Sequence, residues 1–290
     1  MARLVARGLV WGVMRGGEGS KPWAAQYIEA MLSSGPFAGA AGRLGWPRRC
    51  LLCSAWDHQA LCAACLHVHG GPAVPSTRPR CPGCGLRLAL GVPRCAACER
   101  DPPKHGAVRV AVDYAHPWDR VLMQFKFGAR PDCAAAMALL MAQTLQPHIS
   151  PLERSGPGPL AHHPPMRLVP VPLSRERLAQ RGYNQAWELA RRLALRLGLK
   201  ARADALTRSV HLAGQAEQDR AARLQRLRGV FQLSPQGRTW VAGQRVALVD
   251  DVLTTGATAA EAASALLAGG AAGVEVWAFA RTPAPEEGPS

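Results

Sequence analysis

Two adjacent carboxylates, Asp250 and Asp251, lie between a run of four apolar residues and a loop of small residues. The apolar run, residues 246–249, is typical of a buried parallel strand, and the acids stand at its carboxyl end. An Ala-rich helical pattern follows, and the loop before it consists of Thr254, Thr255, Gly256, Ala257 and Thr258. Because a helix start presents unpaired N–H groups and a positive dipole end, this loop is predicted to bind a phosphate.

The two acids indicate which kind of phosphate compound fits. Carboxylates accept hydrogen bonds from vicinal hydroxyls, so the pair favours a sugar phosphate with free 2- and 3-hydroxyls over a nucleoside triphosphate. The Walker pattern GxxxxGK[ST] is absent from the chain. Residues 246–258 resemble the signature of the type I phosphoribosyltransferases, whose loop binds the 5-phosphate of phosphoribosyl pyrophosphate. The alternative is a buried strand that merely ends in an Asp–Asp turn.

Eight of the nine cysteines form four CxxC pairs, separated by eight, fifteen and ten residues. Two CxxC turns complete one tetrahedral all-cysteine zinc site, so eight thiolates predict two structural zinc ions. We prefer sequential pairing to a cross-braced arrangement, because the ten-residue return to Cys95 suits a compact zinc ribbon. Cys133 is predicted to be a buried small residue rather than a ligand. The predicted ligands are Cys50, Cys53, Cys62, Cys65, Cys81, Cys84, Cys95 and Cys98.

A disulfide framework is the alternative for these cysteines. We expect no secretory signal peptide, and a sugar-phosphate enzyme is expected in the cytoplasm, where thiols stay reduced. The cysteine spacing therefore favours zinc.

A second loop is predicted at the same edge of the sheet, over residues 172–185, between a strand at 167–171 and a helix at 186–197. Arg175, Arg177 and Arg181 supply planar donors for phosphate, and Gly182 allows close approach of the backbone. We interpret this segment as a pyrophosphate loop. The alternative is a turn and helix cap, with Asn184 as the capping residue.

Length and composition indicate two unequal domains and no membrane span. The chain has 290 residues and 48% hydrophobic content, which permits an ordinary core beside a small metal-stapled domain. The expected divisions are a poorly structured extension (1–45), a zinc-binding domain (46–104), a main domain (105–283) and a tail (284–290). The predicted fold class of the main domain is α/β, a parallel sheet with helices on both faces.

The net charge of +15 is unevenly distributed. Residues 167–231 contain fourteen Arg or Lys and five acids. Such a density of cations favours a polyanion, either pyrophosphate in a site or nucleic acid on a surface, and the alternative is a solvated helix surface.

Several segments together resemble the ComF family of phosphoribosyltransferase-like proteins over about residues 50 to 282. They are the four CxxC pairs, residues 113–130, 169–190, 206–215 and 246–258, the segment that contains Arg223 and ends at residues 229–233, and the last strand at 274–282. The resemblance implies a type I phosphoribosyltransferase fold, with Asp250 and Asp251 on the ribose and residues 254–258 on the 5-phosphate. It places near pyrophosphate Arg181, Gly182, Tyr183, Asn184 and Gln185, and near the mouth of the site Lys126, Arg208 and Gln215.

The chain departs from the family's pattern at Leu212, Gln218 and Arg226, in a segment that resembles the mobile loop covering the site of type I enzymes. The sequence therefore decides neither which acceptor the protein uses nor whether it turns over. Two classes of function also remain as alternatives. In one, the protein is a Mg²⁺-dependent glycosyltransferase of nucleotide metabolism or DNA uptake that releases pyrophosphate, with Asp250, Asp251, Arg181 and Lys126 as its catalytic residues. In the other, it is a binding module of natural transformation, whose partners are single-stranded DNA and competence or recombination proteins.

Overall fold

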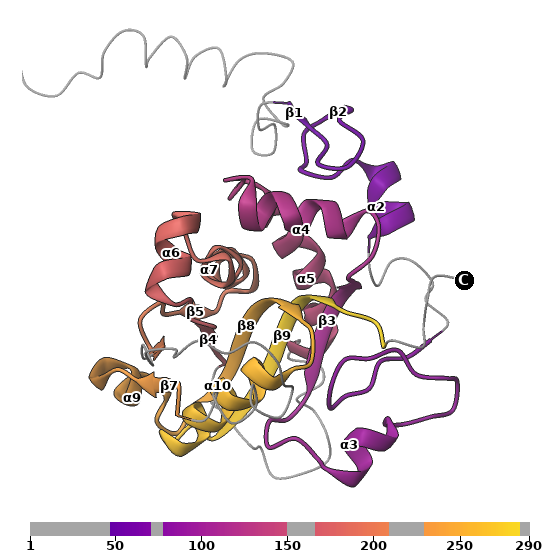
Figure 1. Cartoon of the computed structure of the whole chain (residues 1–290). Helices are drawn as coiled ribbons and strands as arrows, with labels where there is room; N and C mark the ends of the chain where they lie inside the picture. The colour runs from indigo at the N-terminus through magenta and orange to yellow at the C-terminus, as the bar shows by residue number, and fades with distance from the viewer. Residues whose placement is uncertain (1–46, 71–77, 150–165, 209–228, 285–290) are drawn as a thin grey trace, which may run out of the picture. The chain divides into compact units, whose positions relative to one another are not determined.

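The computed structural model describes residues 47–70, 78–149, 166–208 and 229–284 (Figure 1). All of them belong to one unit, Pro47–Ser290. The predicted extension at 1–45, residues 285–290 of the predicted tail, and Gln215 lie outside the described residues. The predicted domain boundaries stay predictions.

Five parallel strands form one sheet in the order β3-β9-β8-β4-β5. The strands are β3 (Val108–Asp113), β9 (Gly273–Arg281), β8 (Arg245–Leu253), β4 (Arg167–Pro170) and β5 (Lys200–Ala201). β8 is the central strand, and its apolar run at 246–249 is fully buried because helices cover both faces of a parallel sheet. The predicted strands at 167–171 and 246–249 are therefore present.

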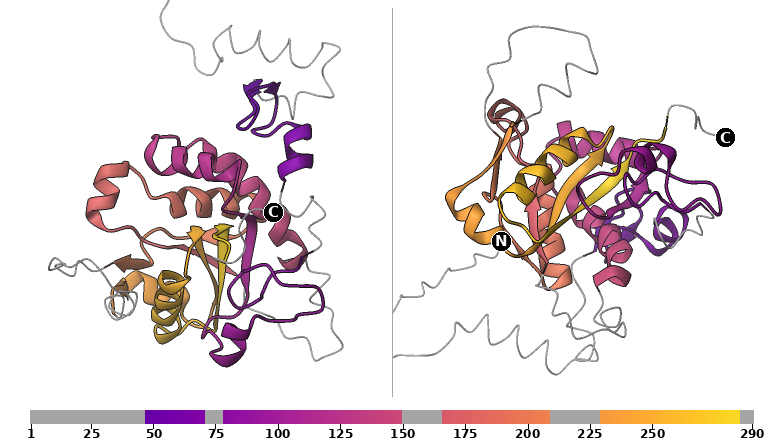
Figure 2. Two further views of the ribbon diagram at one scale, coloured as in Figure 1. Left: turned by 45° about the vertical axis from the view of Figure 1, so that its right-hand side comes forward. Right: turned by 90° about the horizontal axis from the view of Figure 1, so that it is seen from below.

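Two hydrophobic cores lie on the two faces of the sheet, and alternate residues of β8 contribute to each. Ala247 and Val249 pack with α4 (Trp118–Phe127), α5 (Cys133–Ile149) and α7 (Gln185–Leu197). Val246 and Leu248 pack with α10 (Ala257–Ala268). The helical layers can be followed in the two views of Figure 2. The predicted α/β fold class, with helices on both faces of a parallel sheet, is confirmed.

The helix predicted at 186–197 is α7, which begins one residue earlier at Gln185. Ala186, Leu189 and Leu193 are buried, as the apolar periodicity predicts. Cys133 is fully buried in the first turn of α5, which agrees with its predicted role as a small core residue.

Two local predictions were wrong. β8 does not end at Val249 but continues to Leu253, because Asp250 pairs with Ala278 of β9 and Val252 pairs with Ala280. The segment 172–185 is not a continuous loop, since it contains helix α6 (Arg175–Arg181). The Ser174 side chain caps the start of α6, and Gly182 ends it in the left-handed conformation (φ 75°).

The remaining elements surround the sheet. An antiparallel pair, β6 (Leu206–Arg208) and β7 (Phe231–Leu233), precedes α9 (Pro235–Val241). The cysteine-rich segment contains β1 (Arg48–Arg49), β2 (Trp56–Asp57), α2 (Ala63–His69) and α3 (Ala96–Arg100). No helix within the described ranges is long and apolar enough to cross a bilayer.

Candidate functional site

The two acids lie near the carboxyl end of β8, where the Asp251 N–H donates to Oδ1 of Asp250 at 2.8 Å. Asp251 follows Ala247 and Val249 onto the face covered by α4, α5 and α7, and only 8% of its surface is exposed. Burial and the neighbouring Asp251 carboxylate raise the pKa of Asp250 to about 8. Ionisation of Asp250 beside a second carboxylate is therefore disfavoured.

Lys126 supplies a cation to this pair from the last turn of α4. Its Nζ lies 3.4 Å from Oδ2 of Asp251, and both side chains are largely buried. An amino group at this position balances the Asp251 carboxylate and is available to an anionic ligand at the same edge of the sheet. The structure thus brings together three residues that the sequence predicts for the site, Lys126, Asp250 and Asp251.

The predicted phosphate loop connects β8 to α10. Thr254 and Thr255 are exposed, and Gly256 precedes the helix in the left-handed conformation (φ 82°). Among the described residues, no atom lies within 4 Å of a Cβ placed at Gly256, so the space beside this glycine is open. Because α10 begins at Ala257, both Ala257 and Thr258 belong to its first turn, where N–H groups and the positive dipole end favour an anion.

Two residues around the start of α7 bind the backbone of α4. The Tyr183 hydroxyl donates to the backbone carbonyl of Phe125, and Nε2 of Gln185 donates to the same carbonyl at 3.4 Å. Phe125 directly precedes Lys126, so these bonds position the lysine. Asn184 caps α7 by accepting from the Trp187 N–H, which agrees with the helix-cap alternative. The side chains of Tyr183, Asn184 and Gln185 are thus used in structural hydrogen bonds.

The predicted phosphate-binding arginines differ in their surroundings. Arg181 donates to Oε1 of Gln185 at 3.1 Å, and its guanidinium stacks on the exposed ring of Phe127, 5.1 Å from the ring centroid. This places Arg181 beside the residue that follows Lys126. Arg175 is exposed on α6. Arg208 stacks on Phe231 at the end of β6, and no contact of the described residues joins it to the acids.

Arg281 is a residue that the sequence analysis missed. It ends β9 and is 6% exposed, and it donates to the carbonyls of Leu253, Thr254 and Cys84. Burial lowers its pKa, and the carbonyl acceptors compensate the buried cation. Arg281 therefore fixes the start of the phosphate loop. The signal for it in the sequence is a single charge at the end of an otherwise apolar strand.

The eight CxxC cysteines form two separate groups, each with all four Sγ atoms within 4.8 Å of one another. One contains Cys50, Cys53, Cys62 and Cys65, and the other contains Cys81, Cys84, Cys95 and Cys98. The predicted sequential pairing is confirmed.

The distances between thiols fit a tetrahedral metal site. The Sγ–Sγ distance is 3.6 Å for Cys53–Cys62 in the first group, and for Cys81–Cys95 and Cys84–Cys95 in the second. Four sulfurs placed about 2.3 Å from one zinc ion would lie about 3.8 Å apart. Both groups have the donor set and the size of a structural zinc site.

Neighbouring thiols cannot all ionise without a cation. Burial raises the pKa of Cys50, but N–H donors of Cys53 and Cys62 outweigh it and lower the pKa to about 6. In the same group, burial and neighbouring thiols raise the pKa of Cys65. The second group shows the same division, with the pKa of Cys81 lowered to about 7 and that of Cys84 raised to about 11. A divalent cation would remove this conflict.

Each cysteine group is attached to the α/β part by specific contacts. In the first group, Cys50 belongs to the core that includes α4 and α5, and Nε1 of Trp118 donates to the His69 carbonyl at the end of α2. In the second, the Val108 N–H of edge strand β3 donates to the Pro82 carbonyl. Close packing leaves Gly85 no room for a Cβ, which would lie 2.7 Å from Val110.

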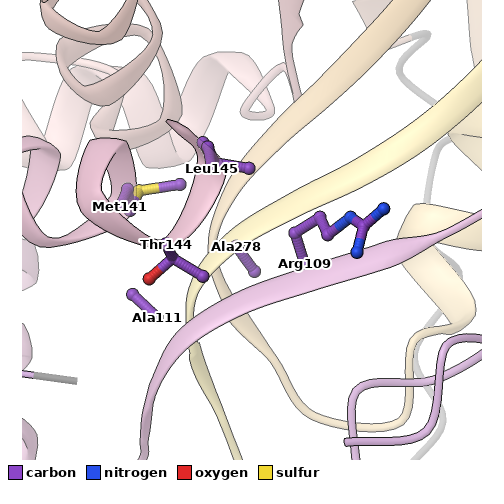
Figure 3. Close-up of a pocket in the computed structure, with 6 residues that line it drawn as sticks. All are labelled: Arg109, Ala111, Met141, Thr144, Leu145 and Ala278. Carbon is purple, nitrogen blue, oxygen red and sulfur yellow. The ribbon is translucent and has the colours of Figure 1, made fainter. Parts of the chain in front are cut away.

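Figure 3 shows a small hollow between α5 and the neighbouring strands. It has no space for a water-sized molecule, and its lining is mainly apolar: Arg109, Ala111, Met141, Thr144, Leu145 and Ala278. Its one charged side chain, Arg109, contacts Nε2 of His148 at 3.1 Å. We interpret this hollow as a packing irregularity and not as a ligand site.

Comparisons with known proteins give the following relatives. The chain is 35% identical to the DNA utilization protein YhgH of Salmonella typhi over 239 residues, which cover 81% of this chain and 98% of that protein. It is 29% identical to competence protein F of Haemophilus influenzae over 238 residues, or 80% of this chain and 96% of that protein.

No family model matches the chain. Among solved structures, the chain is similar to the glutamine phosphoribosylpyrophosphate amidotransferase from B. subtilis complexed with ADP and GMP. The TM-score is 0.31 at 18% identity, over 53% of this chain and 30% of that one.

Proposed function

This chain belongs to the family of the DNA utilization protein YhgH and competence protein F, and we propose that it binds phosphoribosyl pyrophosphate or a related ribose 5-phosphate. One observation carries the proposal: Asp250 and Asp251, with Lys126 Nζ 3.4 Å from Asp251, stand two residues before the exposed loop at the start of α10. Acceptors for hydroxyl groups and a cradle for phosphate are thus only a few residues apart on one strand and loop.

The ligand is assigned to these groups by its chemistry. The 5-phosphate lies on the loop of Thr254, Thr255 and Gly256, and the ribose hydroxyls donate to Asp250 and Asp251. Carboxylate oxygens are also the ligands that Mg²⁺ prefers, so the same two residues fit the ion. When bound, Mg²⁺ would offset the negative charge of a departing pyrophosphate.

A titration with three compounds tests this assignment. Calorimetry would compare phosphoribosyl pyrophosphate, ribose 5-phosphate and inorganic pyrophosphate, each with and without Mg²⁺. We expect the two ribose compounds to bind, and phosphoribosyl pyrophosphate to bind most tightly with Mg²⁺. Tight binding of pyrophosphate with no binding of ribose 5-phosphate would contradict the proposal, because it would mean that the site recognises phosphate alone.

Turnover is a further part of the proposal. The reaction would be transfer of the 5-phosphoribosyl group: a bond forms between C1 of the ribose and the acceptor, the bond from C1 to pyrophosphate breaks, and the acceptor loses a proton. Arg181, held beside Phe127 next to Lys126, and the exposed Arg175 are the cations that we assign to pyrophosphate. A coupled assay for released pyrophosphate, with water or a nitrogen compound as acceptor, tests turnover separately from binding.

We also propose that each cysteine group holds one structural zinc ion. The support is the tetrathiolate donor set and the 3.6 Å Sγ–Sγ distances. The ions would hold together segments that contain little other secondary structure, because α2 and α3 have seven and five residues.

Single-stranded DNA binding is the second candidate function. The relatives are named for DNA utilization and competence, and the net charge of +15 favours a polyanion. On α7, however, Arg191 and Arg192 both pair with Glu188, so this helix offers fewer unpaired cations than its sequence suggests. Affinity for an oligonucleotide should fall with salt, at a log–log slope of about −0.7 per phosphate contacted. A salt-independent affinity would exclude this candidate.

A further inference from the structure

A cleft of about 460 Å³ lies between α9 and the edge of the sheet formed by β4 and β5, and none of its lining residues is one of the acids at the carboxyl end of β8. It is lined by Arg167, Arg202, Gln236, Thr239 and Trp240. Arg167 is the first residue of β4, and Arg202 directly follows β5. The other three residues belong to α9, which leads towards the start of β8 and lies beside β7 in Figure 1.

The position of α9 is fixed by contacts at its first turn. The Ser234 side chain caps the helix by accepting from the Gly237 N–H at 2.8 Å, and the Ser234 N–H donates to the Ala205 carbonyl at 3.1 Å. Gly237 packs directly on the same carbonyl, since a Cβ at this position would lie 2.0 Å from the oxygen. Trp240, one turn later, is therefore held beside Arg167 and Arg202.

Two guanidinium groups contact the indole of Trp240. Arg167 lies 4.4 Å and Arg202 lies 5.8 Å from the ring centroid, both within the range of a cation–π contact. Arg167 also donates to the backbone carbonyl of Trp240. These contacts hold the cations at the cleft rather than leaving them extended in solvent.

The cleft keeps an excess of positive charge. Arg202 pairs with Asp204 at 2.7 Å, but no carboxylate in the described part of the chain pairs with Arg167. Lys200 and Arg238 are exposed on the adjoining elements and add to the positive charge. A ligand of this cleft is therefore expected to be an anion.

We propose that the cleft binds one nucleotide unit, with its phosphate on Arg167 and Arg202 and its base against Trp240. Arginine forks suit phosphate oxygens, and an aromatic ring beside them suits the face of a base. Thr239 and Gln236, both exposed, supply a hydroxyl and an amide for the sugar or the base edge. The volume falls within the range of about 300–1,000 Å³ that is usual for small-ligand sites.

The unit can be a free nucleotide or one residue of a single strand. In the second case the inference rests on the proposed binding of single-stranded DNA, and it assigns that binding to the cleft. It is independent of the sugar-phosphate site, because none of its lining residues contacts Asp250, Asp251 or Lys126.

The test uses the full-length protein and two probes, uridine 5′-monophosphate and a fluorescein-labelled oligothymidylate, read by calorimetry and by anisotropy. We expect Trp240→Leu and Arg167→Met each to weaken binding about tenfold, because a stacked base and a phosphate contact are lost. Arg120→Met is the matched control, since it removes one exposed arginine from α4 and should leave the affinity unchanged. Binding of the monophosphate distinguishes a free nucleotide from a residue that binds only within a strand.

A second measurement guards against variants that fail to fold. Wild-type protein would be irradiated with an oligonucleotide that contains 5-iodouracil, and the crosslinked residue would be identified by mass spectrometry. We expect the crosslink at Trp240 or a neighbour on α9. A crosslink elsewhere, or wild-type affinity for both probes in folded Arg167→Met protein, would overturn the proposal that the cleft binds a nucleotide. If DNA binding is unchanged in these variants, the protein binds DNA at another site, and the proposal for the cleft is wrong.

Discussion

The guanidinium of Arg281 donates a 2.8 Å hydrogen bond to the backbone carbonyl of Cys84. Cys84 belongs to the second cysteine group, and the same guanidinium also holds the carbonyls of Leu253 and Thr254 at the start of the predicted phosphate loop. One buried side chain thus joins the second cysteine group to the edge of the candidate site. A substitution in the second cysteine group should therefore affect the loop, and a substitution at the loop should affect the cysteine group.

The first prediction concerns Arg281→Met. The change leaves the carbonyls of Cys84 and Thr254 without the donor that they have among the described residues, whereas Leu253 keeps the Thr282 N–H, so the free energy of unfolding should fall by about 2–3 kcal/mol. Urea unfolding measures this loss. Affinity for phosphoribosyl pyrophosphate should fall as well, because the loop loses an anchor. Arg120→Met, which removes an exposed arginine of α4, should change neither quantity. Equal stability of the two variants would contradict the role given to Arg281.

The second prediction concerns zinc. Because the thiols form two separate groups, Cys50→Ser and Cys81→Ser should each lower the zinc content from about two ions per chain to about one. Elemental analysis of the purified proteins measures this content. Cys133→Ala is the control, since this cysteine is buried in α5 and belongs to neither group. Two zinc ions retained in Cys81→Ser, or a metal-free wild type with disulfides, would rule out the assignment.

The third prediction concerns pH. Burial and Asp251 raise the pKa of Asp250 from 3.8 to about 8, so the folded protein keeps a proton that the unfolded chain releases above about pH 4. Stability from this group is fully present below about pH 4 and is lost as the pH rises through 8. The Asp250→Asn variant has no carboxyl group at this position that could ionise. The free energy of unfolding of the variant should therefore exceed that of wild type by more at pH 8 than at pH 5. The same difference at both pH values would show that the pKa of Asp250 is not raised.

The fourth prediction concerns the support of the cleft. Gly237→Ala would place a Cβ 2.0 Å from the Ala205 carbonyl oxygen, so α9 must move. We expect a loss of about 1–3 kcal/mol in thermal or urea unfolding. Gly273→Ala is the control, because a Cβ there meets nothing within 4 Å. A change within about 0.5 kcal/mol for both variants would mean that α9 is not held by this contact.

The features that were predictable from the sequence are those with local signals. The apolar run at 246–249 predicts a buried strand, and the CxxC spacings predict two groups of thiols, because each depends on neighbours along the chain. Helix α6 also carries local signals, a cap at Ser174 and a left-handed Gly182, but the arginines between them were interpreted as a loop.

The features that the sequence did not reveal depend on distant residues. Arg281 and Cys84 are 197 positions apart, and no periodicity links a strand-end arginine to a cysteine turn. Trp240 meets Arg167 only because Gly237 packs on Ala205, which a one-dimensional pattern does not contain. The roles of Tyr183 and Gln185 likewise follow from a single carbonyl on α4. For these residues the resemblance predicts proximity to pyrophosphate, whereas the structure uses their side chains to position Lys126.

The most direct test of the sugar-phosphate site is the affinity of Asp250→Asn/Asp251→Asn protein for phosphoribosyl pyrophosphate with Mg²⁺, measured by calorimetry. The control is Glu99→Gln/Asp119→Asn, which removes two carboxylates elsewhere in the described chain. Zinc content and thermal unfolding of both variants would show that they are folded. Since each lost charged hydrogen bond costs about 1.5–3 kcal/mol, we predict that the first variant binds at least about 100-fold more weakly than wild type and the control binds normally. Wild-type affinity in the folded Asp250→Asn/Asp251→Asn protein would contradict the sugar-phosphate site.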